Sequence, residues 1–179
     1  MGLSQKEYAA SYTYDDYKQW EGDWELIYGM PYAMAPAPTL EHQTISTKIT
    51  WQLVESLKEC PSCKALLPID WKISEDTIVQ PDNLVICHKP LKNEYLTKAP
   101  AIIFEILSKS TANKDLNLKY EIYEKEGVKY YIIVEPKEKI AKVYRLENGR
   151  YIKVIDAHSE SVVFKLDKCN FSFDFSKIW

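Results

Sequence analysis

A single carboxylate interrupts an apolar run near the middle of the chain. Residues 101–107 read Ala-Ile-Ile-Phe-Glu-Ile-Leu, and the run is bounded by Pro100 and Ser108. A run of this length, rich in isoleucine, is typical of a fully buried strand. An ionised Glu105 inside such a strand is costly unless a cation or strong hydrogen bonds compensate its charge. The sequence therefore predicts a buried central strand and a polar partner for Glu105.

A second strand is predicted at residues 82–87, with Pro81 at its entrance, where the missing N–H does little harm. If the two strands pair antiparallel, Asp82 at the start of one lies beside Glu105 near the end of the other. Two converging carboxylates favour a hard cation such as Mg²⁺ or Mn²⁺, because these ions take oxygen ligands. The alternative is that Asp82 is an ordinary turn residue after Pro81.

The remaining pattern predicts an α+β fold with a central mixed β-sheet flanked by helices. An N-terminal hairpin at 24–34 and C-terminal antiparallel strands are expected as additions to the core. Apolar residues at helical spacing predict a helix over 113–126, with Leu116, Tyr120 and Tyr123 on its buried stripe. Further helices are expected at 13–20 and 40–58, and strands at 69–73, 129–134, 140–146, 151–155, 162–164 and 171–175.

Several short motifs, taken in order, resemble the PD-(D/E)XK restriction-endonuclease-like superfamily. The chain looks closest to the branch of endonuclease-like proteins that was long catalogued as a domain of unknown function. The resemblance extends from about Tyr12 to Arg145, within a single domain expected over 1–179 with its core at roughly 12–146. The motifs are Glu25-Leu26-Ile27-Tyr28-Gly29, Glu41-His42, Gln80-Pro81-Asp82, Glu105-Ile106-Leu107-Ser108, Asp115-Leu116 with Lys119 and Tyr123, and Gly127-Val128 with 130–134.

The resemblance implies a Mg²⁺-dependent (or Mn²⁺-dependent) endonuclease acting on DNA, with Asp82 and Glu105 as metal ligands. The chain departs from the superfamily pattern two residues after Glu105, where Leu107 stands in place of a lysine. In the resembled branch this role moves to the following helix, which implicates Lys119. Two structural alternatives remain open for Lys119: a buried ion pair with Glu105, or a solvated lysine paired with Asp115.

Two further residues are implicated by their positions in the resembled family. His42 lies near a helix N-terminus, where its protonated form is disfavoured, so a neutral base or hydrogen-bond acceptor is expected. Glu25 would complete the acidic cluster as a third carboxylate. The alternatives are a surface or core histidine and a solvent-facing glutamate on an edge strand. Tyr123 is expected to support the site rather than to act in the chemistry.

The overall charge supports a second hypothesis. A net charge of −3 gives no general attraction to DNA, so any basic surface must be local. The alternative function is a catalytically weak or inactive nuclease-fold module that serves in DNA binding or protein assembly. Neither a secretory signal nor an apolar stretch of membrane-spanning length is visible, so a cytoplasmic protein with no membrane partner is expected. A homodimer is implied by resemblance alone.

The four cysteines suit a reducing compartment. Cys60 and Cys63 have the spacing of a redox or zinc motif, but a zinc site needs a second pair, and Cys87-His88 is the nearby candidate. We therefore expect that Cys60 and Cys63 bind no zinc and form no structural disulfide.

Overall fold

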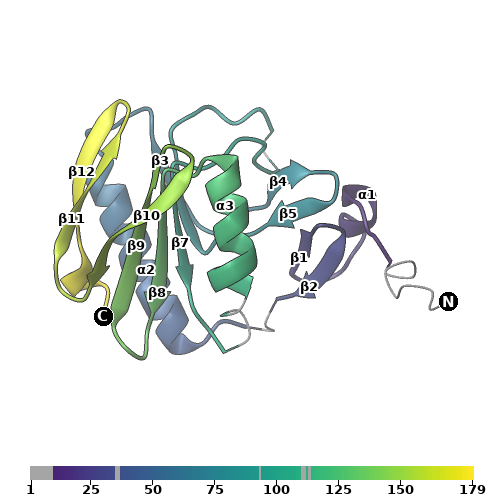
Figure 1. The fold of residues 1–179 in the computed structure, drawn as a ribbon, viewed down its shortest axis with the longest axis horizontal. Helices are drawn as coiled ribbons and strands as arrows, with labels where there is room; N and C mark the ends of the chain where they lie inside the picture. The colour runs from purple at the N-terminus through teal and green to yellow at the C-terminus, as the bar shows by residue number, and fades with distance from the viewer. Residues whose placement is uncertain (1–9, 35–36, 93, 110–111, 113) are drawn as a thin grey trace.

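The structure is a computed structural model that describes residues 10–34, 37–92, 94–109, 112 and 114–179 (Figure 1). Its strands form a six-stranded sheet, a four-stranded sheet and a separate pair. The six-stranded sheet has the order β10-β9-β8-β7-β6-β3. Strands β7 and β8 pair parallel, and every other pair of neighbouring strands in this sheet is antiparallel. The predicted α+β fold with a mixed central sheet is confirmed. Its strands are β3 (Lys64–Leu66), β6 (Asn83–Ile86), β7 (Ile102–Ile106), β8 (Tyr130–Glu135), β9 (Ile140–Glu147) and β10 (Arg150–Ala157).

Alternate residues of β7 divide the core into two layers. Phe104 packs with helix α2 (Leu40–Ser56) and with the strand pair β11 (Ser161–Leu166) and β12 (Cys169–Asp174). Ile103 packs with α3 (Tyr120–Glu126) on the opposite face. The two helices accordingly lie on opposite sides of the sheet, as Figure 1 shows. After β12 the chain ends in a short 3₁₀ turn, η3 (Phe175–Lys177). Because side chains alternate along a strand, Glu105 shares the α3 face with Ile103.

The N-terminal hairpin belongs to the smaller sheet, which has the order β2-β1-β5-β4. Its turn places Tyr28 at φ 52° and Gly29 at φ 76°, the left-handed backbone that a two-residue hairpin turn requires. The predicted hairpin and its turn are confirmed, but strands β3 and β5 were not predicted. The elements are α1 (Tyr14–Tyr17), β1 (Trp24–Ile27), β2 (Met30–Ala33), β4 (Trp71–Ser74) and β5 (Thr77–Val79).

The helix expected over 113–126 differs from prediction in its first half. A π-helical segment, η2 (Lys114–Lys119), precedes α3, and Gly127 ends the helix at φ 84°. Leu116 is 36% exposed, so its assignment to the buried stripe was wrong. The reason is geometric: the stripe was read with α-helical spacing, and the wider π turn changes which residues face the sheet. Asn113 lies outside the described residues, as does the side chain of Asp115.

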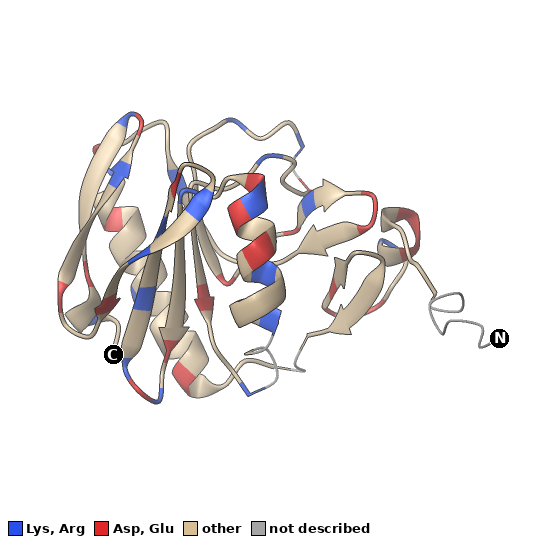
Figure 2. Ribbon diagram, in the orientation of Figure 1, with Lys and Arg blue, Asp and Glu red and all other residues tan. Residues whose placement is uncertain are grey.

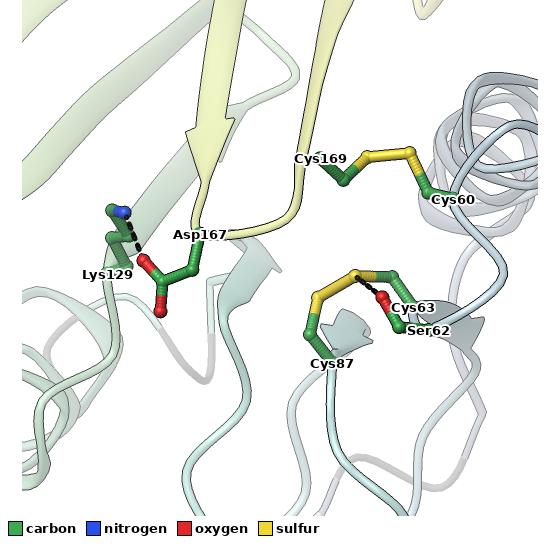
Figure 3. The surroundings of a disulfide bond; sticks show 7 residues. All are labelled: Cys60, Ser62, Cys63, Cys87, Lys129, Asp167 and Cys169. Atoms are coloured by element: carbon green, nitrogen blue, oxygen red, sulfur yellow. Dashed lines mark hydrogen bonds and ion pairs between the residues drawn. A yellow bond between two sulfur atoms is a disulfide. The ribbon is translucent and has the colours of Figure 1, made fainter.

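The expectation that Cys60 and Cys63 form no structural disulfide is wrong. Cys60 is bonded to Cys169 and Cys63 to Cys87, over sequence separations of 109 and 24 residues (Figure 3). The pairing of β3 with β6 explains the second bond, because Lys64 lies opposite Ile86 and the same register brings Cys63 opposite Cys87. No free cysteine remains among the described residues. The zinc half of the expectation stays a prediction.

Charged residues of both signs are interspersed over the molecule, and both signs occur along α3 (Figure 2). Within the described ranges, no helix is both long and apolar enough to cross a membrane.

Candidate active site

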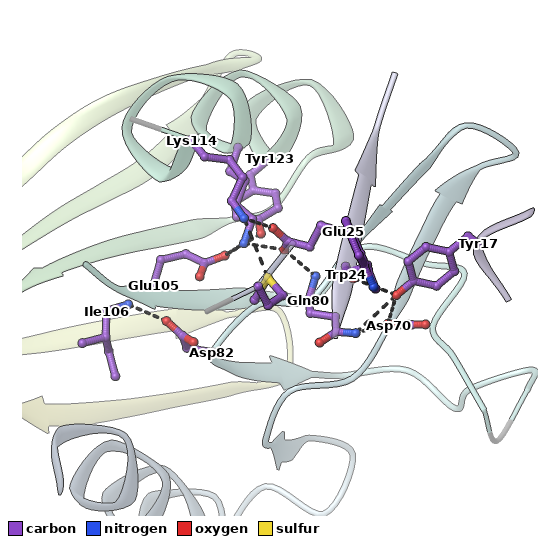
Figure 4. Close-up of polar contacts among 12 residues, drawn as sticks. Tyr17, Trp24, Glu25, Asp70, Gln80, Asp82, Glu105, Ile106, Lys114 and Tyr123 are labelled. Carbon is purple, nitrogen blue, oxygen red and sulfur yellow. Dashed lines mark hydrogen bonds and ion pairs between the residues drawn. The ribbon is translucent and has the colours of Figure 1, made fainter. Parts of the chain in front are cut away.

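Glu105 is buried near the end of β7, with 2% of its surface exposed. The Lys119 ammonium group donates to its Oε1 at 2.8 Å, and the Tyr123 hydroxyl donates to the same oxygen at 2.7 Å (Figure 4). Lys119 and Tyr123 are four residues apart, so both point from one face of the helix toward the sheet. These charge-assisted hydrogen bonds offset the cost of burying the carboxylate.

Asp82 lies beside Glu105 because β6 and β7 pair antiparallel. Asn83 is opposite Phe104, and the same register continues to bring Asp82 opposite Glu105. Directly opposed residues project from the same face of a sheet. Asp82 Oδ2 also accepts a hydrogen bond of 2.7 Å from the backbone N–H of Ile106. The inferred antiparallel pairing is therefore confirmed, while the predicted spacing of about 4–6 Å between the carboxylates stays a prediction.

His42 reaches Asp82 from the first turn of α2. Its Nε2 lies 3.2 Å from Asp82 Oδ1, and the two side chains are mostly buried. Thr39 caps this helix by accepting a hydrogen bond of 3.1 Å from the His42 backbone N–H, which fixes where the imidazole leaves the helix. His42 is thus placed to orient one oxygen of Asp82, while Ile106 holds the other.

Glu25 is fully buried on β1 rather than exposed on an edge strand. Its carboxylate contacts Lys119 at 2.7 Å, forms a second ion pair with Lys114, and accepts a hydrogen bond of 2.8 Å from the Gln80 backbone N–H. Burial alone would raise the pKa of Glu25, but the ammonium groups of Lys119 and Lys114 outweigh it and hold the pKa below its ordinary value. Lys119 therefore bridges Glu25 and Glu105 across the two sheets.

Lys119 has 1% of its surface exposed, which rules out the reading of a solvated lysine. The other structural alternative, a buried ion pair with Glu105, is present. Leu107 lies two residues beyond Glu105 and packs with the apolar cluster on the α3 side of the sheet. The lysine partner of Glu105 thus comes from the helix and not from the strand position that the superfamily pattern uses.

Lys114 belongs to the same cluster and was missed in the sequence. It is five residues before Lys119, a spacing that places two residues on different sides of an α-helix. In a π-helix the hydrogen bonds run from i to i+5, so residues five apart lie one turn apart and share a side. Both lysines consequently reach Glu25. Only a sequence signal for the π turn could have revealed this pair.

A cavity of about 1160 Å³ opens over these groups. Its wall includes Asp82, Glu105, His42, Lys114 and Lys119, whereas Glu25 lies behind the two lysines and does not line it. Other carboxylates surround the cavity, contributed by Asp23, Glu41, Asp70, Glu94, Glu135 and Glu138.

Asp70 ties the cavity wall to the N-terminal sheet. It accepts hydrogen bonds from the Tyr17 hydroxyl at 2.9 Å and from the Gln80 amide at 2.7 Å (Figure 4). Burial raises the pKa of Asp70 and prevails over these two hydrogen bonds, which lower it. Gln80 thus contacts Glu25 with its backbone and Asp70 with its side chain, which fixes the chain just before Asp82.

The donor set suits a divalent cation that keeps part of its water shell. Among the described residues, no group of three or more His, Cys, Asp or Glu side chains is arranged to hold a metal. Mg²⁺ needs fewer protein ligands, since one or two carboxylates plus waters and substrate oxygens complete its octahedron. Asp82 and Glu105 supply two carboxylates on the wall of a cavity with room for water. The residues present therefore fit Mg²⁺ or Mn²⁺.

Fold and site together define an α+β protein with a buried carboxylate–lysine cluster that opens on a cavity at the junction of two sheets. The chain belongs to the Uma2 family, described as "Putative restriction endonuclease", whose profile matches residues 14–166. A comparison with solved structures finds a protein of the same fold from Anabaena variabilis ATCC 29413, described as a putative nuclease belonging to DUF820. It has 18% sequence identity and a TM-score of 0.75, over 93% of this chain and 96% of that one. A search of curated proteins finds no match.

Proposed function

We propose that the protein is a metal-dependent endonuclease that hydrolyses phosphodiester bonds of DNA on a restriction-endonuclease-like core. The observation that carries the proposal is the pairing of Asp82 and Glu105 on neighbouring strands, with Lys119 bound to Glu105 at 2.8 Å beside a large cavity. Membership of the Uma2 family supports the same reaction class.

In this proposal Asp82 and Glu105 hold Mg²⁺ or Mn²⁺. When bound, the cation supplies Lewis acidity and lowers the pKa of a coordinated water. Lys119 binds and orients Glu105, and its positive charge would help to orient the attacking water and to offset charge that develops on the phosphate. His42 and Ile106 hold Asp82 by its two oxygens, and Glu25 positions Lys119.

The alternative function is a DNA-binding or assembly module that no longer cleaves. The acidic residues around the cavity favour the assembly role, because they repel the backbone of a long duplex. The intact Asp82, Glu105 and Lys119 set favours cleavage, since a binding module has no need of a buried, compensated carboxylate pair. The cytoplasmic location and the homodimer stay predictions.

The two functions separate in a cleavage assay on supercoiled plasmid and linear DNA with Mg²⁺ or Mn²⁺. We expect nicking that chelation abolishes and that Asp82→Asn lowers by about a hundredfold or more, a change of several kcal/mol in transition-state stabilisation. Lys125→Ala, at an exposed lysine of α3 that does not line the cavity, is the control and should retain activity within about twofold. Metal-independent DNA binding without any cleavage would favour the module instead.

A further inference from the structure

Lys114 supplies the site with a positive charge that the sequence pattern does not assign. Its side chain lines the cavity, with 9% of the residue exposed, while its partner Glu25 is fully buried behind it. The Lys119 ammonium group lies 2.7 Å from Glu25 Oε1, so the Glu25 carboxylate is contacted by the ammonium groups of both lysines. Lys119 is shared with Glu105, whereas Glu25 is the one carboxylate paired with Lys114 among the described residues.

The hydrogen-bonding capacity of Lys114 is only partly used. An ammonium group has three donors, and here one is directed at Glu25. Another faces the Met34 sulfur at 3.8 Å, a weak acceptor, and the Tyr32 ring centroid lies 5.7 Å from Nζ. A phosphate oxygen entering the cavity would be a stronger acceptor than the thioether and could replace it.

The formal charges of the cluster also favour a phosphate ligand. The side chains of Glu25, Glu105 and Asp82 carry three formal negative charges and those of Lys114 and Lys119 two positive ones, which leaves one negative charge on these five side chains. A divalent cation on Asp82 and Glu105 changes this to one positive charge. A single phosphodiester group, which carries one negative charge, then balances these five side chains and the cation.

We propose that Lys114 is a phosphate-binding residue of this site and contacts the DNA backbone next to the metal. This inference rests on the proposed function. Its two effects have opposite signs. Lys114 repels the divalent cation, because it lies in the same cluster, and it attracts the phosphate. Removal of its charge should therefore strengthen metal binding and weaken DNA binding, whereas loss of a purely structural lysine would loosen the site and weaken both.

The test compares the parent protein with Lys114→Met, a variant that keeps most of the side-chain length but has no charge. Mn²⁺ affinity is measured by calorimetry without DNA. We expect it to rise severalfold, because removal of a like charge from the same cluster weakens the repulsion of the ion. The affinity for a short DNA duplex is measured with Ca²⁺ between about 50 and 200 mM salt. We expect it to fall about five- to tenfold and the slope of log affinity against log salt to lose about one.

Two matched variants keep the result interpretable. Lys125→Met makes the same change at an exposed position of α3, away from the cavity, and should match the parent in both affinities. Lys114→Arg keeps the charge and should hold both within about twofold, which covers the case in which Lys114→Met fails to fold.

The outcomes separate this inference from the function on which it rests. Suppose that the parent binds Mn²⁺ and cleaves DNA. If Lys114→Met then equals the parent in both affinities, or is weaker in both, the proposed role of Lys114 is wrong and the proposed nuclease function is unaffected. A parent that binds neither Mn²⁺ nor DNA overturns both.

Discussion

Lys119 holds two carboxylates that belong to different sheets, Glu25 at 2.7 Å and Glu105 at 2.8 Å. Its removal does not leave either acid without a partner, since Glu25 keeps Lys114 and Glu105 keeps Tyr123. The cost to folding should therefore be smaller than for a simple buried pair, while the ammonium group that we propose orients the attacking water is lost completely.

For Lys119→Met we accordingly expect a loss of cleavage of about 10²–10⁴-fold, the range of a positioned proton-handling group. The free energy of unfolding should fall by less than about 3 kcal/mol, the lower limit for breaking an isolated buried pair. Single-turnover cleavage and urea unfolding measure the two effects. Activity equal to that of the parent would remove Lys119 from the mechanism, and unfolding of the variant would assign it a structural role.

Glu25 should make stability depend on pH in the acid range. The pKa of Glu25 is below its ordinary value of 4.5 in the folded protein, so the folded state binds fewer protons than the unfolded state as the carboxylate titrates. The stabilisation is present above about pH 4.5 and is lost as the pH falls through the lower folded value. At neutral pH, Glu25→Gln should cost about 3–5 kcal/mol, because two buried lysines lose their shared carboxylate.

The measurement is denaturant unfolding of the parent and of Glu25→Gln at pH steps from 7 down to about 3. The difference between the two free energies should shrink toward acid pH. Asp70, whose pKa is raised, contributes with the opposite sign; burial is the main cause and is the same in both proteins, so most of this contribution cancels in the difference, apart from the part that the charge of Glu25 adds. A difference that stays constant with pH would contradict the ion-paired state of Glu25.

At the scale of elements, the π-helical segment η2 contains one residue more than an α-helix would need to bring Lys114 and Lys119 to the same side. Lys114 and Lys119 must both reach Glu25, and Gly127 closes the helix. If one exposed residue of the segment were deleted, the lysines would be four apart. In an α-helix that spacing also places them on one face.

Deletion of Leu116 should therefore convert η2 into α-helix and keep both ion pairs. We expect a melting temperature equal to or above that of the parent, because α-helical hydrogen bonds replace the rarer π pattern. Deletion of Glu121 in α3 is the control. It rotates Ile122 and Tyr123, both buried, by roughly 100° about the helix axis relative to Lys119 and should lower the melting temperature. Thermal unfolding followed by circular dichroism measures both, and a strongly destabilised Leu116 deletion would show that the π turn itself is needed.

The parts of the site that could be predicted from sequence are those set by regular periodicity. The closeness of Asp82 and Glu105 follows from the pairing of two apolar strands. Lys119 was implicated by the family resemblance, and helical spacing then placed it on one face with Tyr123. Lys114 could not be predicted, because five residues in an α-helix separate two side chains. The burial of Glu25 also could not be predicted, since it depends on how a second sheet docks against the first.

At the scale of the whole molecule, the disulfides connect the end of α2 to two other parts of the fold. The Cys60–Cys169 bond joins the segment after α2 to the C-terminal strand pair, and the Cys63–Cys87 bond joins it to the end of β6. Sequence did not reveal them because each depends on the closure of a tertiary contact, and the spacing of Cys60 and Cys63 suggested one local motif instead.

Each bond should stabilise the protein by about 2–4 kcal/mol, chiefly by restricting the unfolded chain. For a chain of this size that corresponds to roughly 4–16 °C in melting temperature per bond. Calorimetry of Cys63→Ser/Cys87→Ser and Cys60→Ser/Cys169→Ser, against the oxidised parent, tests this. Intact mass before and after alkylation checks that both bonds are present. Double variants that melt with the parent would show that the bonds add no stability.

The position of Glu25 also has a consequence for the order in which the chain can fold. Glu25 lies near the N-terminus, but the two ammonium groups that neutralise it come from residues 114 and 119. Until those residues have been synthesised, the N-terminal hairpin cannot bury its carboxylate without a large desolvation cost. The hairpin should therefore dock late, after the central sheet and its helix. Substitutions at Glu25 should then change the unfolding rate while leaving the refolding rate nearly untouched, which stopped-flow kinetics can measure. Because the proposed nuclease centre needs that docking, a growing or partly folded chain would carry no competent site, and any cleavage of DNA would appear only with the finished molecule.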